Sequence, residues 1–385
     1  MTDTLTIGIL GGGQLGKMLS QAAKRMGFGT IVLDPTPECP AYGVADDQIV
    51  ADFKDESAIR QLAERSDVIT YEIELGNSRV LKELEELGTI VNPSPETLEV
   101  IQDKLKQKEF LRNNKIPVPN FSKVESLDDL MHALHDDFTF PAFLKATKDS
   151  YDGRGNYFLQ SVKDVEPAFN KFKGRELMLE EYVPFDKEVS VIAARNTHGK
   201  VSSYPVGENI HTDSILDKTI VPARIDEKTQ SQARKIAERT LKVLKGAGVF
   251  GIEMFAEHSG IRVNEIAPRV HNSGHYSIEA SYTSQFEQHI RAILGLPLGD
   301  ASLRSHVVMK NILGQPGFEG RYKIDGVTEA LSIPGVYLHM YGKKEVRPKR
   351  KMGHLTVVDV EGKKDTDLLI SRAETARSLL RLEPL

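Results

Sequence analysis

The chain has very little cysteine and no long hydrophobic stretch. Cys39 is the only cysteine among 385 residues, so no disulfide can form within the chain, and a reducing compartment is expected. No apolar run approaches the roughly 18 residues that a membrane-spanning helix requires. The N-terminus also lacks a basic segment followed by a full apolar stretch. We therefore expect a cytoplasmic protein that is neither secreted nor embedded in a membrane.

The chain also lacks an excess of positive charge. Its formal net charge is -5 at pH 7, and it contains no internal repeat or low-complexity segment. A negative charge does not suggest a general nucleic-acid-binding protein. With 40% hydrophobic and 27% charged residues the composition is that of a globular protein. Because 385 residues exceed one ordinary hydrophobic core, two or three domains are expected.

The N-terminal region is predicted to be a doubly wound parallel sheet. Residues 5–10 form a short apolar strand that runs into the glycine-rich segment 11–16, and an amphipathic helix follows. Residues 30–33 and 67–70 read as further buried strands. Such a strand–helix–strand start opens a parallel α/β sheet. A single helix over residues 93–112 is predicted to close this region.

The remaining chain is predicted to be α+β. A small domain extends from residue 120 to about 172, and two strands joined at Pro184 follow it. Apolar spacing predicts a helix over residues 228–245. Short strands after Pro297 lead to a final helix over residues 367–380. The expected domains are 1–116, 117–176, 177–296 and 297–385.

The strongest chemical signal lies in residues 248–275. Two segments alternate apolar and polar residues around a predicted three-residue turn at 258–260. This turn places Glu253 opposite Glu265, and two facing carboxylates about 5 Å apart repel each other unless a cation lies between them. Oxygen ligands without His or Cys suit Mg²⁺, which water and nucleotide phosphates complete. The alternative is that both acids are solvated on a surface hairpin. The many polar residues of 264–275 argue against this alternative, because scaffold segments rarely carry so many polar groups.

The glycine-rich segment supports two interpretations. Gly11, Gly13 and Gly16 match the G-x-G-x-x-G spacing of a dinucleotide-binding loop, and Asp34 ends the next strand, where it could bind a ribose. A nicotinamide-dependent enzyme is therefore an alternative, although no hydride-transfer site is evident downstream. The same loop can equally serve a phosphorylated substrate.

Four weaker motifs could bind nucleotide or phosphate. Residues 150–156 combine glycines, a cation and hydroxyl or amide groups, as in a lid that closes over phosphates, although a plain hairpin has the same composition. Lys145 stands next to this loop as a phosphate ligand or a surface lysine. Acids at 180–181 and Glu188 could bind adenine and ribose or lie on an exposed edge. The lysines and arginines of 343–351 suit a phosphate clamp, with a solvated basic loop as the alternative.

Together these segments resemble the ATP-grasp superfamily and, within it, the N5-carboxyaminoimidazole ribonucleotide synthetases of purine biosynthesis. The resemblance runs almost end to end and includes GILGGGQLGKML, DVITYEIE, QDKLKQKEFL, YDGRGN, GVFGIEMF, NEIAPRVHNSGH and KEVRPKRKMGH. It implies an ATP-grasp fold with an N-terminal doubly wound parallel sheet, a small lid domain and a larger C-terminal α+β domain. The β-rich C-terminal portion would complete the substrate site.

The resemblance also assigns residues to each ligand. It implies ATP contacts from Lys104, Lys145, Ser150, Tyr151, Asp152, Gly153, Arg154, Gly155, Asn156, Glu180, Glu181, Tyr182, Val183, Glu188, His211, Asn264 and Glu265. Glu253 and Glu265 fall on the Mg²⁺ ligands, and Mn²⁺ could replace Mg²⁺. Contacts to 5-aminoimidazole ribonucleotide are implied for Gln14, Glu74, Tyr151, Asp152, Lys343, Lys344, Arg347 and Arg350. The catalytic set is Arg269 and His271, around the bicarbonate-derived intermediate, with Asp152 and Glu74.

The implied activity is that of a ligase. It would carboxylate 5-aminoimidazole ribonucleotide with bicarbonate at the expense of ATP, through carboxyphosphate, releasing ADP and phosphate in purine biosynthesis. The family's members are commonly homodimers. A formate-dependent transformylase on a similar scaffold is the closest alternative. The nicotinamide-dependent dehydrogenase and a non-catalytic nucleotide sensor are the others.

Overall fold

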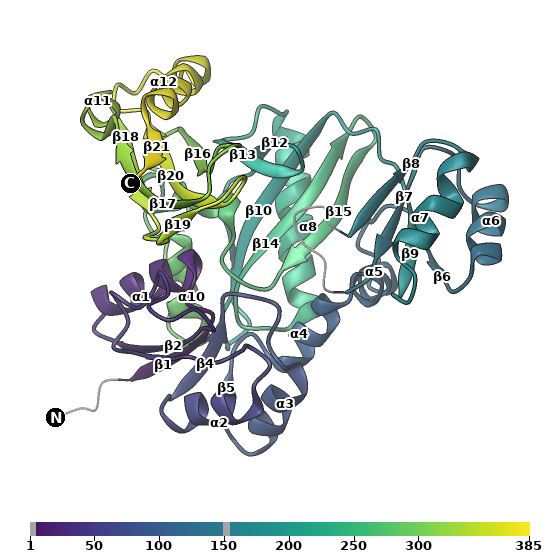
Figure 1. Cartoon of the computed structure of the whole chain (residues 1–385), viewed down its shortest axis with the longest axis horizontal. Coiled ribbons are helices and arrows are strands. Elements are labelled where there is room, and N and C mark those ends of the chain that lie inside the picture. The colour runs from purple at the N-terminus through teal and green to yellow at the C-terminus, as the bar shows by residue number, and fades with distance from the viewer. Residues whose placement is uncertain (1–4, 149–154) are drawn as a thin grey trace.

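The computed structural model describes residues 5–148 and 155–385. Its N-terminal unit is a five-stranded parallel sheet in the order β3-β2-β1-β4-β5, with helices on its faces (Figure 1). The strands are β1 (Thr6–Leu10), β2 (Gly29–Leu33), β3 (Asp47–Ile49), β4 (Val68–Tyr71) and β5 (Ile90–Val91). The connecting helices are α1 (Gln14–Arg25), α2 (Glu56–Glu64) and α3 (Ser78–Glu86). The predicted doubly wound parallel sheet is confirmed.

The predicted single helix over residues 93–112 is wrong, because the segment forms two helices. They are α4 (Pro95–Gln102) and α5 (Lys104–Asn113). Asp103 between them has an extended backbone, with φ -118° and ψ 111°, and its side chain accepts the N–H groups of Leu105 and Lys106. Aspartate favours such a cap over a helix interior. The break places Lys104 in the first turn of α5.

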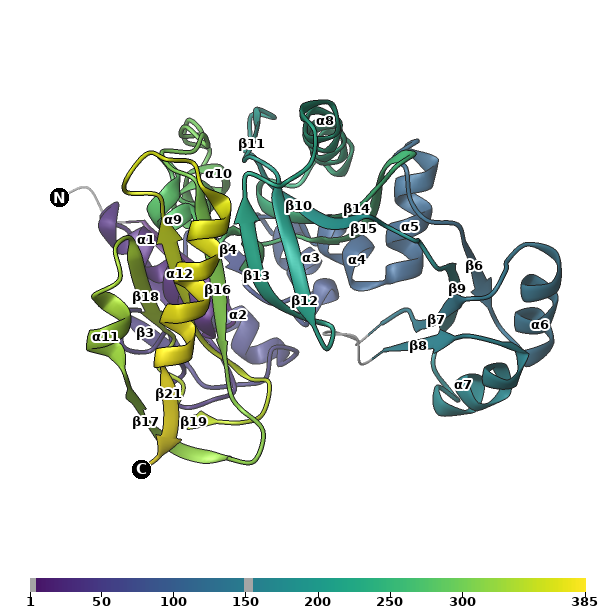
Figure 2. The same cartoon turned by 90° about the horizontal axis from the view of Figure 1, so that it is seen from above.

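The second unit is a four-stranded antiparallel sheet in the order β6-β9-β7-β8. It comprises β6 (Phe121–Val124), α6 (Leu127–Asp136), β7 (Ala142–Ala146), β8 (Asn156–Leu159), the 3-10 turn η1 (Val162–Asp164), α7 (Val165–Lys171) and β9 (Leu177–Glu181). This unit projects as a lobe from one side of the molecule (Figure 2). Because β9 pairs with both β6 and β7, we propose that the lid unit extends through Glu181 instead of ending at residue 176.

A large antiparallel sheet forms the body of the molecule, in the order β15-β14-β10-β12-β13-β16-β20-β18, with β11 beside β10. Its strands are β10 (Lys187–Arg195), β11 (Val201–Ser203), β12 (Gly207–Thr212), β13 (Ile215–Val221), β14 (Gly248–Glu257), β15 (Gly260–Ala267), β16 (Val307–Leu313), β18 (Val336–Met340) and β20 (Lys351–Val358). The predicted strands after Pro297 are confirmed, and three of them extend this sheet. The third and fourth expected domains therefore share one sheet.

Strand β10 shows why helices cover both faces of this sheet. Val191 and Ala193 pack in one core with α8 (Glu227–Leu244), whereas Ile192 and Ala194 pack in another with α10 (Gln285–Ile293) and the N-terminal unit. This alternation is the two-residue period of a strand. The predicted helix over 228–245 is confirmed; it ends at Leu244, and the following Lys245 caps it in the left-handed conformation with φ 62°.

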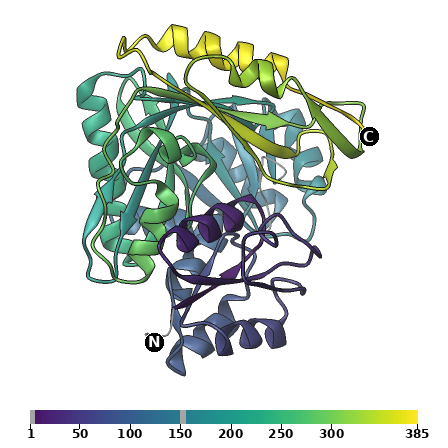
Figure 3. The same ribbon diagram turned by 90° about the vertical axis from the view of Figure 1, so that its left-hand side faces the viewer.

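The remaining elements lie around the C-terminal strands. They are η2 (Asn272–Gly274), α9 (Ser277–Ala280), β17 (Gly320–Asp325), α11 (Val327–Leu331), β19 (Glu345–Val346), α12 (Thr366–Leu379) and β21 (Arg381–Pro384). Helix α12 confirms the predicted final helix, and Figure 3 shows it in yellow at the end of the molecule opposite the N-terminal unit. Within residues 5–148 and 155–385, no helix has the length and apolar character needed to cross a membrane.

Candidate active site

A cleft of about 1890 Å³ lies where the three units meet. Its walls come from the carboxyl ends of the N-terminal parallel strands, the lid sheet, the central sheet and the basic loop before β20. Ligands commonly bind outside the carboxyl ends of strands in such open α/β sheets. Among the described residues, every predicted site residue lines this cleft except Lys344 and Arg347. The predicted residues Ser150, Tyr151, Asp152, Gly153 and Arg154 lie outside the described residues.

In the hairpin β14–β15 the two predicted metal ligands face each other across the strands, as expected, but the strand register differs from the predicted one. Glu257 pairs with Gly260, so the turn has two residues, 258–259, and the predicted three-residue turn is wrong. That register alone would place Glu253 opposite Asn264. A β-bulge between Glu253 and Met254 shifts the pairing by one residue, and Glu253 faces Glu265. Bulges of this kind re-aim side chains next to functional sites.

Two carboxylates on neighbouring strands suit a divalent cation bound by oxygen ligands. Glu265 faces the cleft with a side chain 44% exposed, and Lys104 Nζ lies 2.7 Å from its Oε2. Burial lowers the pKa of Lys104, but the charge and hydrogen bond of Glu265 outweigh it and raise that pKa. No group of three or more His, Cys, Asp or Glu side chains suited to a metal occurs in the described part of the chain. Mg²⁺ commonly binds through only one or two carboxylates, because water and phosphate supply the rest.

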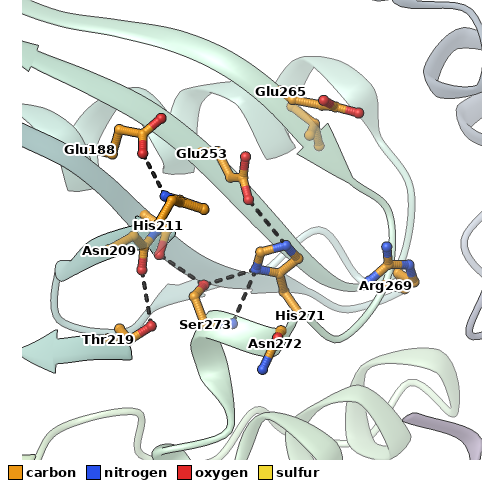
Figure 4. Close-up of polar contacts among 12 residues, drawn as sticks. Glu188, Asn209, His211, Thr219, Glu253, Glu265, Arg269, His271, Asn272 and Ser273 are labelled. Atoms are coloured by element: carbon orange, nitrogen blue, oxygen red, sulfur yellow. Dashed lines mark hydrogen bonds and ion pairs between the residues drawn. The ribbon is translucent and has the colours of Figure 1, made fainter. Parts of the chain in front are cut away.

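His271 is held against Glu253 in one orientation (Figure 4). Its Nε2 lies 3.3 Å from Glu253 Oε1. On the other side of the ring, the Ser273 backbone N–H donates to Nδ1 at 3.3 Å. Nδ1 therefore accepts, and the ring proton belongs on Nε2, facing the carboxylate. Burial raises the pKa of Glu253, but the hydrogen bond and charge of His271, with His211 and Lys104, lower it to about 2.

Arg269 and Glu74 form an ion pair that joins the N-terminal unit to the central sheet. Arg269 Nε lies 2.8 Å from Glu74 Oε1, and both side chains are largely buried in the cleft. Burial lowers the pKa of the guanidinium, but the charges of Glu74, Glu72 and Glu265 raise it. The sequence assigned Glu74 to the ribonucleotide and Arg269 to the bicarbonate-derived intermediate. The structure brings these two side chains together at one point of the cleft.

Glu180 is the centre of a buried charge cluster. Lys108 Nζ lies 2.8 Å from its Oε2, Lys145 contacts its Oε1, and the Glu180 side chain is 2% exposed. Burial raises the pKa of Glu180, but the charges and hydrogen bonds of both lysines lower it to about 2. The carboxylate therefore fixes Lys145 at the cleft wall. The predicted contact of Glu180 with adenine stays a prediction.

Replacing Glu180 with glutamine is expected to lower the free energy of unfolding by about 3 kcal/mol, because two buried ammonium groups lose their counter-charge. Since the pKa is about 2 in the folded protein against an ordinary 4.5, this stabilisation is complete above about pH 4.5 and is lost as the pH falls towards 2. Urea denaturation measures the loss. Glu176→Gln is the matched control, because that exposed lid carboxylate pairs with Lys148 at the surface. Equal losses from both variants would contradict the cluster's role.

The residues predicted to contact the nucleotide come from several elements. His211 Nδ1 on β12 lies 2.5 Å from Glu188 Oε2 on β10. Burial lowers the pKa of His211, but the hydrogen bond and charge of Glu188 raise it. Tyr182 is 40% exposed and packs its ring against Phe143 and Phe158. These aromatic rings form an apolar wall beside charged groups, as in typical ligand sites.

The basic loop divides into cleft residues and surface residues. Lys343, Arg350 and Lys351 line the cleft. Lys344 and Arg347 do not, and their exposed side chains pair with Glu38 and Glu345 respectively. The structure thus places two of the four loop residues that the resemblance assigned to the ribonucleotide outside the cleft lining. Lys351, which belongs to the predicted clamp but not to those four, lines the cleft.

The glycine loop is closed by the chain's own carboxylates. The Gly12 N–H donates to Asp34 Oδ2 at 3.0 Å, and Glu72 accepts from Gly13 and Gly16 at 2.8 Å each. Asp34 is only 7% exposed. A dinucleotide-binding loop needs these amides and a free acid for the ribose. The geometry therefore argues against the nicotinamide alternative.

Sequence reasoning missed Glu72, Lys108, Ser273 and Gln285. Gln285 on α10 is fully buried, accepts the His271 N–H at 2.9 Å and donates to the His271 carbonyl at 2.8 Å. All four act through another residue, so they do not stand out as ligands. Two of the four could have been noticed in the sequence: Glu72 is a charged residue at the end of a buried strand, and Lys108 is a charged residue on the buried face of a helix.

Three family models match most of the chain. Residues 4–102 match the ribonucleotide synthetase preATP-grasp domain, and residues 109–286 match the ATP-grasp domain. Residues 307–365 match the phosphoribosylaminoimidazole carboxylase C-terminal domain. These three ranges follow the N-terminal sheet, the lid with the hairpin, and the C-terminal strands.

Curated relatives agree with this assignment. The N5-carboxyaminoimidazole ribonucleotide synthase of Brucella melitensis is 43% identical over 354 residues, covering 91% of this chain and 95% of the relative. The phosphoribosylaminoimidazole carboxylase of Ogataea methanolica is 40% identical over 365 residues, covering 92% of this chain. The chain spans about two thirds of that carboxylase, 67% of its length.

Solved structures resemble this fold over nearly its whole length. The N5-carboxyaminoimidazole ribonucleotide synthetase from Thermotoga maritima is 49% identical, has a TM-score of 0.89, and covers 99% of this chain and 100% of its own. The enzyme from Aspergillus clavatus, in complex with ADP and 5-aminoimidazole ribonucleotide, is 33% identical with a TM-score of 0.89, covering 98% and 99%. The protein therefore belongs to the N5-carboxyaminoimidazole ribonucleotide synthase family of ATP-grasp enzymes.

Proposed function

We propose that the protein carboxylates 5-aminoimidazole ribonucleotide with bicarbonate in an ATP-dependent reaction of purine biosynthesis. The observation that carries this proposal is a cleft lined both by the opposed carboxylates Glu253 and Glu265 and by two sets of cationic groups. One set, Lys104 and Lys145, comes from α5 and the lid sheet and suits a triphosphate. The other, including Arg350, comes from the basic loop before β20 and suits a phosphorylated substrate. The Aspergillus clavatus structure binds ADP and this ribonucleotide, which supports both assignments.

The metal site fits Mg²⁺, with Mn²⁺ as the replacement. Glu253 and Glu265 supply oxygen ligands, and the exposed side of Glu265 faces the cleft, where a nucleotide phosphate could complete the shell. The bound cation would neutralise phosphate charge during phosphoryl transfer. Lys104 Nζ donates to Glu265 Oε2 at 2.7 Å and so neutralises part of the carboxylate charge at this site.

The first chemical step activates bicarbonate. Bicarbonate is a poor electrophile, so its oxygen attacks the γ-phosphate of ATP, forming carboxyphosphate and releasing ADP. Lys104 and Lys145 neutralise the negative charge that spreads over the transferred phosphoryl group. Glu180 holds the Lys145 ammonium group in position. The positive charge of Lys145 therefore needs no reorganisation of the side chain at the moment of reaction.

The second step transfers the carboxyl carbon. Carboxyphosphate breaks down to CO₂ and phosphate, and we assign Arg269 to hold the leaving phosphate in a closed site that excludes water. The exocyclic amine of the ribonucleotide captures the carbon and releases a proton. The phosphate released from carboxyphosphate is a base and can take up this proton. The Nε2–H of His271 faces the cleft, where it can donate a hydrogen bond to the oxygens of the bicarbonate-derived intermediate.

Release of ADP tests the proposed function directly. With ATP, Mg²⁺ and bicarbonate present, ADP formation should depend on added 5-aminoimidazole ribonucleotide. A nucleotide sensor would bind ATP without substrate-stimulated hydrolysis. A nicotinamide enzyme would instead bind NAD(H) saturably, seen by its fluorescence, and would not respond to ATP.

Arg350→Ala is expected to raise the apparent Michaelis constant for the ribonucleotide about ten- to hundredfold, because a charge-assisted contact contributes about 1.5–3 kcal/mol. The constant for ATP should stay nearly unchanged, since Arg350 belongs to the basic loop and not to the set of Lys104 and Lys145 that we assign to the triphosphate. Arg347→Ala is the matched control, because its side chain is exposed and lies outside the cleft lining. Initial rates with each substrate varied in turn measure both constants. A similar rise for ATP would assign the loop to the nucleotide.

We also propose that the protein is a cytoplasmic homodimer, as is common in its family. The single buried cysteine fits a reducing compartment. Sedimentation or light scattering of the purified chain measures the oligomeric state. A monomer at all working concentrations would contradict the dimer.

A further inference from the structure

Glu72 occupies the position at the start of α1 that a bound anion would take in a dinucleotide-binding protein. Its Oε1 accepts the Gly13 N–H at 2.8 Å, and its Oε2 accepts the Gly16 N–H at 2.8 Å. Both amides belong to the loop that leads into the helix, where backbone N–H groups and the helix dipole favour negative charge. The anion at this position is therefore the Glu72 carboxylate, which comes from the segment that connects β4 to α3.

The glycine spacing of the loop follows from the presence of Glu72. A Cβ added at Gly11 would lie 2.3 Å from Glu72 Cγ, and one at Gly13 would lie 2.7 Å from Glu72 Oε1. Gly11 also has φ 104°, a conformation that favours glycine. At Gly16 a Cβ would lie 2.4 Å from the Gly11 carbonyl oxygen. The G-x-G-x-x-G pattern is thus required for packing around an internal carboxylate.

Glu72 also faces the active-site cleft. It is 8% exposed, lines the cleft beside Gln14, and interacts electrostatically with Arg269. Burial raises the pKa of Glu72 above its ordinary value, and the two amide hydrogen bonds and the charge of Arg269 offset only part of this rise. Both carboxylate oxygens nevertheless accept a backbone N–H, which is the arrangement of an ionised carboxylate. The carboxylate therefore connects the glycine loop, which carries Gln14, with the guanidinium that pairs with Glu74.

We propose that Glu72 is a positioning residue, a built-in anion that fills the amide cradle of the glycine loop and sets Gln14 and Arg269 for the ribonucleotide. The substrate phosphate is then left to basic side chains such as Arg350, and the amides of Gly13 and Gly16 do not bind it. This inference rests on the proposed function for the identity of the substrate. It adds to that function the residue that positions Gln14 and Arg269, which line the cleft where the ribonucleotide is proposed to bind.

The kinetic test compares two carboxylates on the same loop. Glu72→Gln removes the charge and one acceptor beside the cleft. Asp34→Asn does the same at Gly12, but Asp34 lies outside the cleft lining. Glu72→Gln should raise the Michaelis constant for the ribonucleotide about tenfold and leave that for ATP within about twofold. Asp34→Asn should change neither constant by more than about twofold. Equal effects from the two variants would overturn the proposal and indicate a purely structural role.

Chemical rescue gives an independent readout. In Glu72→Ala the two amides face an empty space that opens on the cleft, so added acetate should bind there. Acetate should raise the unfolding temperature of Glu72→Ala and lower its Michaelis constant for the ribonucleotide. It should do neither for the unchanged protein or for Asp34→Asn. A variant that folds but shows no response to acetate would overturn the proposal, as would an equal response in all three proteins.

The two readouts separate this proposal from the proposed function. If the unchanged protein shows no ribonucleotide-dependent ADP release, the proposed function fails, and the thermal response to acetate still tests whether the cradle binds a carboxylate. If Glu72→Ala does not fold, Glu72→Gln provides the decisive comparison. Inorganic phosphate in place of acetate tests whether the space left by the Glu72 side chain can also hold a phosphate. If phosphate rescues Glu72→Ala as strongly as acetate does, the amides of Gly13 and Gly16 can bind a substrate phosphate, and the inference is contradicted.

Discussion

Glu265→Gln is expected to abolish turnover while leaving the fold intact. The carboxylate lies opposite Glu253 across the hairpin and faces the cleft, so an amide there removes one of two anionic metal ligands. A loss of about 4 kcal/mol of transition-state stabilisation corresponds to roughly a thousandfold fall in the rate of ADP release. Steady-state assays across a Mg²⁺ titration measure the loss, and circular dichroism with thermal unfolding checks the fold.

The same hairpin offers a matched control for this experiment. Glu257 lies on β14, the strand that carries Glu253, pairs with Arg262 at 2.5 Å, and stands outside the cleft lining. Glu257→Gln should therefore retain ADP release and its Mg²⁺ dependence. Near-normal turnover of Glu265→Gln with an unchanged Mg²⁺ response would sink the paired-carboxylate hypothesis.

The hairpin shows how far local patterns can predict a site. Alternating polarity correctly predicted two strands and the facing pair Glu253 and Glu265. The predicted turn was one residue too long, and the bulge that restores the pairing was not foreseen. A bulge depends on where the extra residue can be accommodated between neighbouring strands, which short-range pattern does not report. The correct pair was thus reached through an incorrect register.

The elements that could not be predicted depend on contacts between distant residues. Lys108 reads as an ordinary surface residue of a helix, yet it is buried against Glu180 on β9. The glycine spacing of residues 11–16 suggested a dinucleotide, because the sequence does not show that Glu72 reaches the same amides. The basic loop likewise gave no sign that Lys344 and Arg347 point away from the cleft. Periodic helices and strands, by contrast, were found because their burial pattern is local.

The break at Asp103 could have been predicted from the sequence, because aspartate commonly caps the start of a helix. The helix-forming residues around it favoured the wrong prediction of one continuous helix. Residues 93–112 carry enough helix-forming residues to suggest one helix, but an aspartate followed by good helix formers is also an N-cap. The structure takes the second option, and the cap sets Lys104 at the helix start, 2.7 Å from Glu265.

The acyl donor distinguishes the proposed carboxylase from the formate-dependent transformylase. Both reactions need ATP, a lid and a ribonucleotide amine, so the fold alone does not choose between them. Bicarbonate carries one more oxygen than formate, and a site built to hydrogen-bond that oxygen leaves buried donors unpaired when formate binds. Arg269 and His271 are the donors that we assign to it. Bicarbonate should support ribonucleotide-dependent ADP formation, and formate in CO₂-free buffer should support little or none.

Arg269→Ala and His271→Ala should each lower the carboxylation rate by about a hundredfold or more, with the dissociation constant of ATP within a few fold. Arg269→Ala also leaves Glu74 buried without its partner at 2.8 Å, so Arg269→Lys, which keeps a charge, should be impaired less. His339→Gln is the matched control for His271, because His339 pairs with Glu279 at 2.7 Å outside the cleft lining. Carboxylation is followed by incorporation of labelled bicarbonate. Robust turnover with formate and indifference to bicarbonate would establish the transformylase activity instead, because only a site without a requirement for the third oxygen can accept formate equally well.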